Sequence, residues 1–380
     1  MGSILMNWIL TLSFFPLAAS RLQRAAVSTE LEQDLQPPAC HPVNRILYIA
    51  TTLDPTDWEG FLPAKAGQMA ALAQSGIEVY MLGFSNAEGL LGTFESSPKA
   101  SGLKKVSNVA AFDTQKVAAW VDENFVPEKT HLVVGSHGSG SGFAENALTR
   151  DSGETILPED PENDVFVLLE SAEFVGLLKG KKFNSIVLDS CVMAELSTAA
   201  AFEDATDLLV ASEGWMWEDD KDTEKTVFSS YTAKQLACAP LEKTREALDN
   251  VVTHYSKFSP RGDLSVIDTS KAAKLASQIR QSGKLMEKLH EWFEGVEEEP
   301  IKFAPGTFYK VEGDDAIYDS KYLLSLHKTL GLGESLGYPG LLQMAGETVL
   351  FQKGPTAERT ETGYTEAIQG ISLSLLAFGS

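Results

Sequence analysis

Two residues with reactive side chains follow short apolar runs of the kind found in buried strands. His137 comes after Leu132-Val133-Val134 and opens a Gly-rich stretch, and Cys191 comes after Ile186-Val187-Leu188-Asp189. A cysteine becomes a useful nucleophile when an imidazole or a helix N-terminus stabilises its thiolate. The two residues therefore predict nucleophilic catalysis at a carbonyl carbon, with Cys191 as nucleophile and His137 handling the proton.

The residues next to this pair fit the same chemistry. A helix is expected to begin near Val192, so that its first-turn amides face the Cys191 sulfur. The glycines after His137 let a peptide backbone approach closely. The backbone amides of Gly138 and Cys191 would then form an oxyanion hole for a tetrahedral intermediate.

Each residue alone also has a plainer explanation. A single buried cysteine is usually an inert apolar residue, and a histidine after a strand is usually structural. The matching positions of His137 and Cys191 at two strand ends favour the functional interpretation. No other histidine has a Gly-rich approach, since the rest lie in linker, helix or strand-start contexts: His41, His131, His254, His290 and His327.

Strand-length apolar runs alternate with helix-length segments between residues 44 and 235. Runs that are apolar throughout are typical of parallel strands buried on both faces, so this order predicts an α/β sandwich. In such sheets reactive groups gather beyond the C-terminal ends of the strands. The expected strands are 46–50, 77–82, 131–134, 186–188 and 208–211; the expected helices are 62–74 with a stop at Gly76, one capped by Asp113 or Thr114, and 171–179.

The two ends of the chain differ from this central region. Residues 1–20 hold an apolar run followed by small residues, which predicts a signal peptide although no Lys or Arg precedes the run. Residues 21–43 are polar with adjacent prolines, typical of a linker or pro-segment. Residues 236–380 predict a smaller, helix-rich region, with long helices over 241–257 and 269–293. The signal-like N-terminus predicts a secreted or otherwise translocated protein. No later segment is apolar enough for a membrane span, so no stable span is expected in the mature chain.

The two motifs together resemble the clostripain family of cysteine peptidases, which are relatives of caspases, legumains and gingipains. One motif is an apolar strand ending in His-Gly with further glycines, here residues 132–140. The other is a strand ending in Asp-small-Cys-apolar-Met, here residues 186–193, and the likeness extends over about residues 45–235. Ser190 and Val192 depart from the Ala and Leu usual in the family, and the His loop carries an extra Ser-Gly. These departures concern substrate detail more than chemistry.

The resemblance implies a caspase-like three-layer sandwich and an endopeptidase with a Cys-His dyad that needs no third acid and no cofactor. It puts Asp189 at the floor of the pocket for the P1 residue, which implies cleavage after Arg or Lys. The plainer alternative is that Asp189 caps the helix expected near Val192. Glu213 follows the next strand and either lines the same pocket or packs in the core, as do Trp215 and Trp217.

The resemblance also implies processing between the histidine and the cysteine. Residues 139–164 are rich in Gly, Glu and Pro and contain Arg150, so self-processing after Arg150 is a hypothesis. An ordinary surface hairpin is the alternative. The resemblance, together with the oxygen ligands that acidic loops offer, leaves calcium binding as an open alternative with no metal site named.

Charge and cysteine content limit the partners. Asp and Glu number 53 against 31 Lys and Arg, a formal charge of -22, which disfavours nucleic acid and suits protein or peptide substrates with basic residues. The three cysteines, Cys40, Cys191 and Cys238, are too few for a disulfide-built scaffold. A bridge between Cys40 and Cys238 is possible, and at least one thiol stays outside any bridge.

Other functions find less support. A serine hydrolase lacks a Gly-x-Ser-x-Gly turn, the Gly-Ser stretch lacks the lysine of a P-loop, and no two histidines have metal-ligand spacing. Arg261-Gly262-Asp263 matches an adhesion tripeptide but is interpreted as a turn. The second functional hypothesis is a catalytically silent caspase-like module used for binding or assembly.

Overall fold

The computed structural model describes most of the chain after residue 40. The predicted signal peptide, most of the predicted linker and Arg150 lie outside the described residues. None of the described helices is both long enough and apolar enough to cross a membrane. The described residues are 41–52, 61–85, 92–98, 104–107, 112–138, 141–145, 148–149, 155–156, 166–213, 226–259, 262–282, 287, 307–310, 316–319, 338–354 and 372–374.

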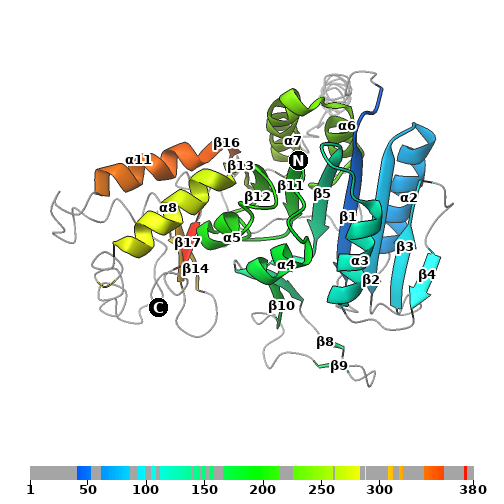
Figure 1. Ribbon diagram of the computed structural model, residues 1–380, viewed down its shortest axis with the longest axis horizontal. Coiled ribbons are helices and arrows are strands. Elements are labelled where there is room, and N and C mark those ends of the chain that lie inside the picture. Colours follow the sequence, from blue (N-terminus) through cyan, green and yellow to red (C-terminus); the bar gives the residue numbers. More distant parts are fainter. Residues whose placement is uncertain are drawn as a thin grey trace, which may run out of the picture. The chain divides into compact units, whose positions relative to one another are not determined.

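A nine-stranded sheet lies at the centre of the fold, in the order β16-β13-β12-β11-β5-β1-β2-β3-β4 (Figure 1). The strands from β12 to β2 are parallel, and two antiparallel strands continue the sheet at each edge. The prediction of a mostly parallel sheet is confirmed. The strands are β1 (Arg45–Thr52), β2 (Glu78–Ser85), β3 (Gly92–Ser96), β4 (Lys104–Ser107), β5 (Thr130–Gly135), β11 (Ser185–Asp189), β12 (Leu208–Ala211), β13 (Leu264–Asp268) and β16 (Val349–Lys353).

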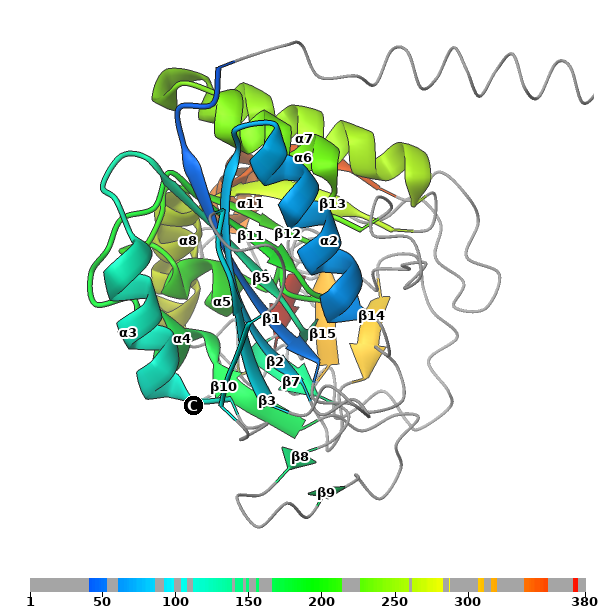
Figure 2. The same ribbon diagram turned by 90° about the vertical axis from the view of Figure 1, so that its right-hand side faces the viewer.

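Helices cover both faces of this sheet, which gives the predicted three layers (Figure 2). The helices α2, α6 and α7 pack on one face, and α3, α4, α5, α8 and α11 pack on the other. Several bounds match the sequence predictions closely, including the Asp113 cap of α3 and the left-handed Gly76 after α2. The bounds are α2 (Phe61–Gln74), α3 (Thr114–Asn124), α4 (Ser171–Leu177), α5 (Leu196–Ala201), α6 (Ser230–Cys238), η1 (Leu241–Lys243), α7 (Thr244–Phe258), α8 (Thr269–Gln281) and α11 (Tyr338–Thr348).

The strands are apolar on both sides because each side faces a separate core. Along β1, Leu47 and Ile49 belong to the cluster under α3, α4 and α8, whereas Ile46 and Tyr48 belong to the cluster under α2, α6 and α7. All four are fully buried. Each such side chain stabilises the fold by about 1.5–3 kcal/mol through removal of apolar surface from water.

The strand order reverses next to β5. From β1 the chain continues to β2 on one side, and later returns to β5 on the other side of β1. In open α/β sheets, a crevice forms beyond the C-terminal ends of the strands at such a reversal. The residues that follow β5, beginning with Ser136 and His137, lie at this edge.

Smaller strands lie outside the main sheet. β6 (His137–Gly138), β7 (Gly142–Glu145) and β10 (Phe166–Glu170) form a three-stranded sheet directly after β5. β8 (Leu148–Thr149) pairs with β9 (Thr155–Ile156). A further three-stranded sheet comprises β14 (Thr307–Lys310), β15 (Ala316–Asp319) and β17 (Ser372–Ser374).

One sequence prediction near Cys191 is wrong. No helix begins near Val192, because residues 191–194 form a turn and α5 starts only at Leu196. Further along, β13 and β16 join the main sheet, although both lie in the region predicted as a C-terminal subdomain. The division into 44–235 and 236–380 stays a prediction.

Candidate active site

The neighbouring parallel strands β5 and β11 bring the two motifs together. Their last residues, Gly135 and Asp189, are register partners. His137 and Cys191 each follow two positions after these partners, so both leave the sheet at the same edge. Adjacent strands are only about 4.8 Å apart. Just beyond the strands, the Ser136 N–H lies 3.4 Å from the Asp189 carbonyl oxygen and 3.2 Å from the Ser190 hydroxyl oxygen.

Gly138 packs directly on the backbone of Cys191. A β-carbon at position 138 would lie 1.9 Å from the Cys191 carbonyl oxygen and 2.9 Å from Cγ of Met193. Both separations are far below van der Waals contact, so the close approach requires glycine. The β6–β7 pairing, with His137 opposite Ala144, fixes the same segment from its other side. His137 and Cys191 are both partly exposed, as groups that meet a substrate must be.

Cys191 opens a tight turn in which the next residue is strained. Val192 has a φ of 51°, a left-handed conformation that a β-branched residue rarely adopts. The turn is held by burial of Val192 and Met193 and by a 2.7 Å hydrogen bond from the Ala194 N–H to the Ser212 carbonyl, after β12. Strain of this kind persists where surrounding contacts determine the backbone, and it clusters at functional sites.

The helix after this turn has its own cap. The fully buried Glu195 carboxylate accepts hydrogen bonds from the N–H groups of Ser197 at 2.7 Å and Thr198 at 3.0 Å. Because α5 begins after Glu195, its first turn does not start at Cys191. The expectation that a helix N-terminus adjoins the sulfur is therefore wrong, and so is the alternative that Asp189 caps the helix.

Asp189 ends β11 as a buried carboxylate with one oxygen in use. Asp189 is only 7% exposed, and its Oδ2 accepts a 3.3 Å hydrogen bond from the Phe228 N–H. Among the described residues, Oδ1 has no hydrogen-bond partner. A buried carboxylate oxygen without a donor is costly, and a bound cationic group would satisfy it.

A sequence model of one peptidase family matches this chain. The model is that of the clostripain family, peptidase family C11, and it covers residues 105–326, more than half of the chain. The chain belongs to the clostripain family. It is therefore a cysteine peptidase by family, and the match includes both motifs.

Solved structures of clostripain-family proteins have the same fold. An inactive zymogen C11 protease from Parabacteroides distasonis is 14% identical, with a TM-score of 0.57 over 90% of this chain and 93% of that chain. A secreted C11 cysteine protease from Bacteroides thetaiotaomicron, iotapain, is 14% identical, with a TM-score of 0.51 over 88% and 94%. A secreted C11 cysteine protease from the same organism, in complex with an irreversible peptide inhibitor, is 12% identical, with a TM-score of 0.52 over 87% and 92%. No curated protein sequence matches the chain.

Glu213 lies beyond the end of β12, fully buried. Its N–H donates to the Asp263 carboxylate at 2.7 Å, and the Ser212 hydroxyl donates to the other Asp263 oxygen at 3.0 Å. Asp263 is itself fully buried, so it holds the end of β12 and is not available as part of an exposed adhesion motif. Trp215 and Trp217 lie outside the described residues.

His131, the second residue of β5, has a structural environment. Its Nδ1 lies 2.8 Å from the Ser185 hydroxyl, and its Nε2 lies 3.2 Å from the side-chain nitrogen of Asn44. Asn44 also donates to the carbonyl oxygens of Leu236 and Ala239 at the end of α6. Desolvation lowers the pKa of His131 from 6.5 to about 3, so the ring is neutral at physiological pH.

The described cysteines differ in their disulfide state. Cys238 is disulfide-bonded, whereas Cys191 is not in a disulfide. Cys40 lies outside the described residues. Within the described part of the chain, no three His, Cys, Asp or Glu residues gather as a metal site, and calcium binding stays a prediction.

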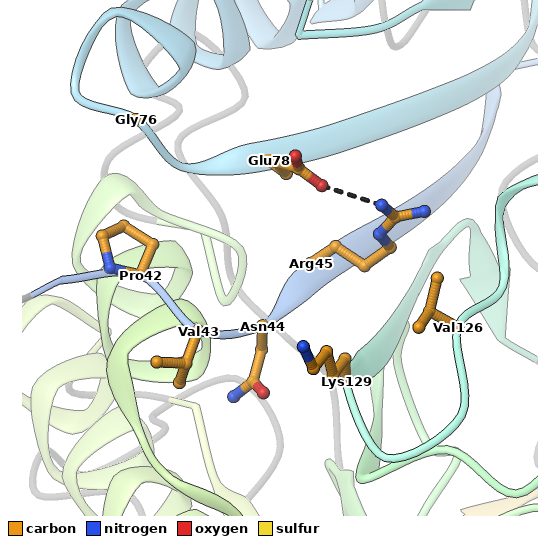
Figure 3. Close-up of a pocket in the computed structure, with 8 residues that line it drawn as sticks. All are labelled: Pro42, Val43, Asn44, Arg45, Gly76, Glu78, Val126 and Lys129. Atoms are coloured by element: carbon orange, nitrogen blue, oxygen red, sulfur yellow. Dashed lines mark hydrogen bonds and ion pairs between the residues drawn. The ribbon is translucent and has the colours of Figure 1, made fainter.

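A pocket of about 330 Å³ opens where the parallel strands begin, at the end opposite to His137 and Cys191 (Figure 3). It is formed by the beginnings of β1 and β2 and by the residues before β5. Arg45 and Glu78 form a 3.0 Å ion pair there, and Arg45 also donates to the Asn124 carbonyl at 2.9 Å. Because the parallel strands start at this edge and end at the other, the pocket is separate from the His137 and Cys191 site.

Two buried charged residues near the site are not among those predicted from the sequence. Asp263 holds the end of β12, and Lys65 of α2 contacts the segment that donates to Asp189. A signal for Lys65 was present, since it is the one charged residue within α2. Asp263 had no such signal, because an acidic residue before a strand is usually part of an exposed turn.

Proposed function

We propose that the chain is a cysteine endopeptidase in which Cys191 is the nucleophile and His137 the general acid and base. The observation that carries this proposal is the packing of Gly138 on the Cys191 carbonyl, at the aligned ends of β5 and β11. This packing holds the residue next to His137 against the backbone of the nucleophile. Family membership favours the same assignment.

The proposed reaction runs through a thioester. The Cys191 thiolate attacks the peptide carbonyl carbon, and the resulting oxyanion is stabilised by the backbone amides of Gly138 and Cys191. Collapse of this intermediate breaks the C–N bond, and the leaving amine takes a proton from the His137 imidazolium. A water molecule, deprotonated by His137, then attacks the thioester, releases the acid and restores the thiol.

The proposed P1 pocket takes Arg or Lys. Its support is the buried Asp189 carboxylate, whose Oδ1 has no donor among the described residues. A guanidinium or ammonium group would supply that donor and neutralise the charge in a partly dry site. Glu213 is proposed as a second acidic residue near the pocket, since it follows β12, the strand next to β11.

Self-processing after Arg150 is proposed because the proposed P1 pocket accepts Arg. Arg150 itself lies outside the described residues, directly after Thr149 of β8. N-terminal sequencing of the purified protein tests this: a new N-terminus at Asp151 is expected in the wild type and not in Cys191→Ala. Recovery of only the intact chain would contradict it.

Export from the cytosol is proposed from two features. Residues 1–20 resemble a signal peptide, and Cys238 is disulfide-bonded, which is typical of oxidising compartments. Iotapain, one of the structural neighbours, is described as secreted.

Hydrolysis of short reporter peptides tests the peptidase proposal. Reporters with Arg, Lys, Asp or Asn at P1 are offered to the wild type and to Cys191→Ala. We expect turnover of Arg or Lys reporters, loss of that turnover in the variant and poor cleavage after Asp. Equal turnover by both proteins would contradict the thiol mechanism, and absence of turnover by the processed wild type would favour the silent binding module.

A further inference from the structure

Lys65 is a fully buried lysine whose ammonium group points at residues 226–229, the segment directly before α6. The Nζ atom donates to the Thr226 hydroxyl and, at 2.7 Å, to the Phe228 carbonyl oxygen. An ammonium group loses several kcal/mol of hydration on burial, so such contacts must be specific to be retained. Lys65 therefore holds this segment through directed hydrogen bonds as well as apolar packing.

Two aromatic rings enclose the same ammonium group. Nζ lies 5.7 Å from the ring centroid of Phe228 and 6.0 Å from that of Tyr48, and these two rings stack with centroids 4.8 Å apart. Tyr48 in turn packs on Gly135, where a β-carbon would lie 2.7 Å from the Tyr48 hydroxyl oxygen. The Lys65 cluster, consisting of Lys65, Tyr48, Thr226 and Phe228, thus adjoins the register pair of Gly135 and Asp189.

Phe228 connects this cluster to the proposed P1 pocket. Its carbonyl oxygen accepts from Lys65, and its N–H donates to Oδ2 of Asp189 at 3.3 Å. The hydrogen bond from Phe228 occupies one Asp189 oxygen and leaves Oδ1 for a ligand. A shift of the Phe228 backbone would therefore change how Asp189 is oriented.

We propose that Lys65 is a positioning residue for P1 recognition, acting through the Phe228 backbone on the Asp189 carboxylate. This inference rests on the proposed function, because it assigns a role in the same pocket. The proposed role gives Lys65 no part in the chemistry of the thiol and the imidazole. Its loss should weaken binding of a basic P1 group while the reactivity of Cys191 stays the same.

The test uses Lys65→Met, which keeps the unbranched apolar stem and most of the length of the side chain and removes its donors. Thr226→Val is the second variant, because it removes one acceptor of Lys65, together with the hydroxyl that donates to the Phe228 carbonyl at 3.2 Å, and spares the buried charge. Met69→Ala is the matched control, since Met69 lies on α2 in the same core cluster and loses only apolar packing. For each folded protein, three quantities are measured: KM and kcat for an Arg reporter, the inhibition constant of benzamidine, and the alkylation rate of Cys191 by iodoacetamide.

We expect Lys65→Met to raise KM and the benzamidine inhibition constant about tenfold, as loss of an oriented charged hydrogen bond does. Thr226→Val should shift both in the same direction by less, and alkylation should change by less than about twofold in all variants. If Lys65→Met does not fold, the positioning role is judged from Thr226→Val. Its KM and benzamidine inhibition constant should then exceed those of Met69→Ala. Unchanged KM and inhibition constants, with only a lower melting temperature, would overturn the positioning role. Absence of turnover by the wild type would instead contradict the proposed function.

Discussion

The α-carbon of Gly138 lies so close to Cys191 that a β-carbon there would come within 1.9 Å of the Cys191 carbonyl oxygen. This contact joins two segments that are more than fifty residues apart in the sequence. It arises because β5 and β11 are neighbours in parallel register and their ends leave the sheet together. The proposed chemistry depends on this relationship.

Replacement of Gly138 tests the contact. Gly138→Ala should lower kcat/KM for an Arg reporter by about 100-fold, because the added methyl group must push the His137 segment away from Cys191. Gly176→Ala on α4 is the control, since a β-carbon there would have no atom within 4 Å apart from its chain neighbours and the backbone of its own helix. Steady-state kinetics of both variants measure the effect. Near wild-type kcat/KM in Gly138→Ala would contradict the close packing of Gly138 on Cys191.

The role of Asp189 is tested by selectivity. Asp189→Asn should reduce kcat/KM for Arg and Lys reporters by about 10- to 100-fold, because the pocket loses the charge that pairs with the P1 group. The Phe228 N–H retains an acceptor in this variant, so the fold should be preserved. Kinetics with a matched uncharged P1 reporter supply the comparison. A parallel loss on both reporters would indicate a role in chemistry or folding instead of recognition.

Glu195 should contribute measurably to stability. Glu195→Ala removes a buried carboxylate that accepts from the Ser197 and Thr198 N–H groups, and it should lower the free energy of unfolding by about 1–3 kcal/mol. Urea denaturation measures the change. Glu203→Ala is the control, because the exposed Glu203 side chain lies just after α5 and should contribute less than about 0.5 kcal/mol. Equal effects of the two substitutions would contradict the capping role.

His131 should make the fold sensitive to acid. Its pKa is 6.5 when exposed and about 3 in the folded chain, so the unfolded state binds the additional proton between these values. The contribution of neutral His131 to the free energy of unfolding is therefore fully present above about pH 6.5. It falls as the pH is lowered toward 3, by up to about 1.4 kcal/mol per pH unit. Urea denaturation from pH 7 to pH 4 should give a shallower decline for His131→Gln. Identical slopes for the two proteins would contradict this contribution.

The central strands, and with them the candidate site residues, could be predicted from the sequence for a physical reason. Strands buried on both faces must be apolar throughout, so β1, β5 and β11 stand out from their neighbours, and the residues that end them are identified at once. That made His137 and Cys191 the candidates. The short polar strands β3 (GTFES) and β4 (KKVS) lie at an edge of the sheet and have no such pattern.

The remaining features depend on contacts between distant segments. Val192 is a β-branched residue, and nothing local predicts its left-handed conformation, which is why a helix was expected where a turn occurs. The contact of Lys65 with Phe228 spans 163 positions, and that of Ser212 with Asp263 spans 51. Side-chain pairings of this kind follow from the packed fold and could not be obtained from periodicity.

Covalent labelling tests the central claim most directly. The purified protein is incubated with a peptide chloromethyl ketone that carries Arg at P1, and the modified residue is located by peptide mass spectrometry. The proposed dyad predicts a single adduct on Cys191, formed at a rate that falls at least about 100-fold in His137→Ala. An adduct on another residue, or equal labelling rates in the wild type and His137→Ala, would contradict the pairing of this imidazole with this thiol.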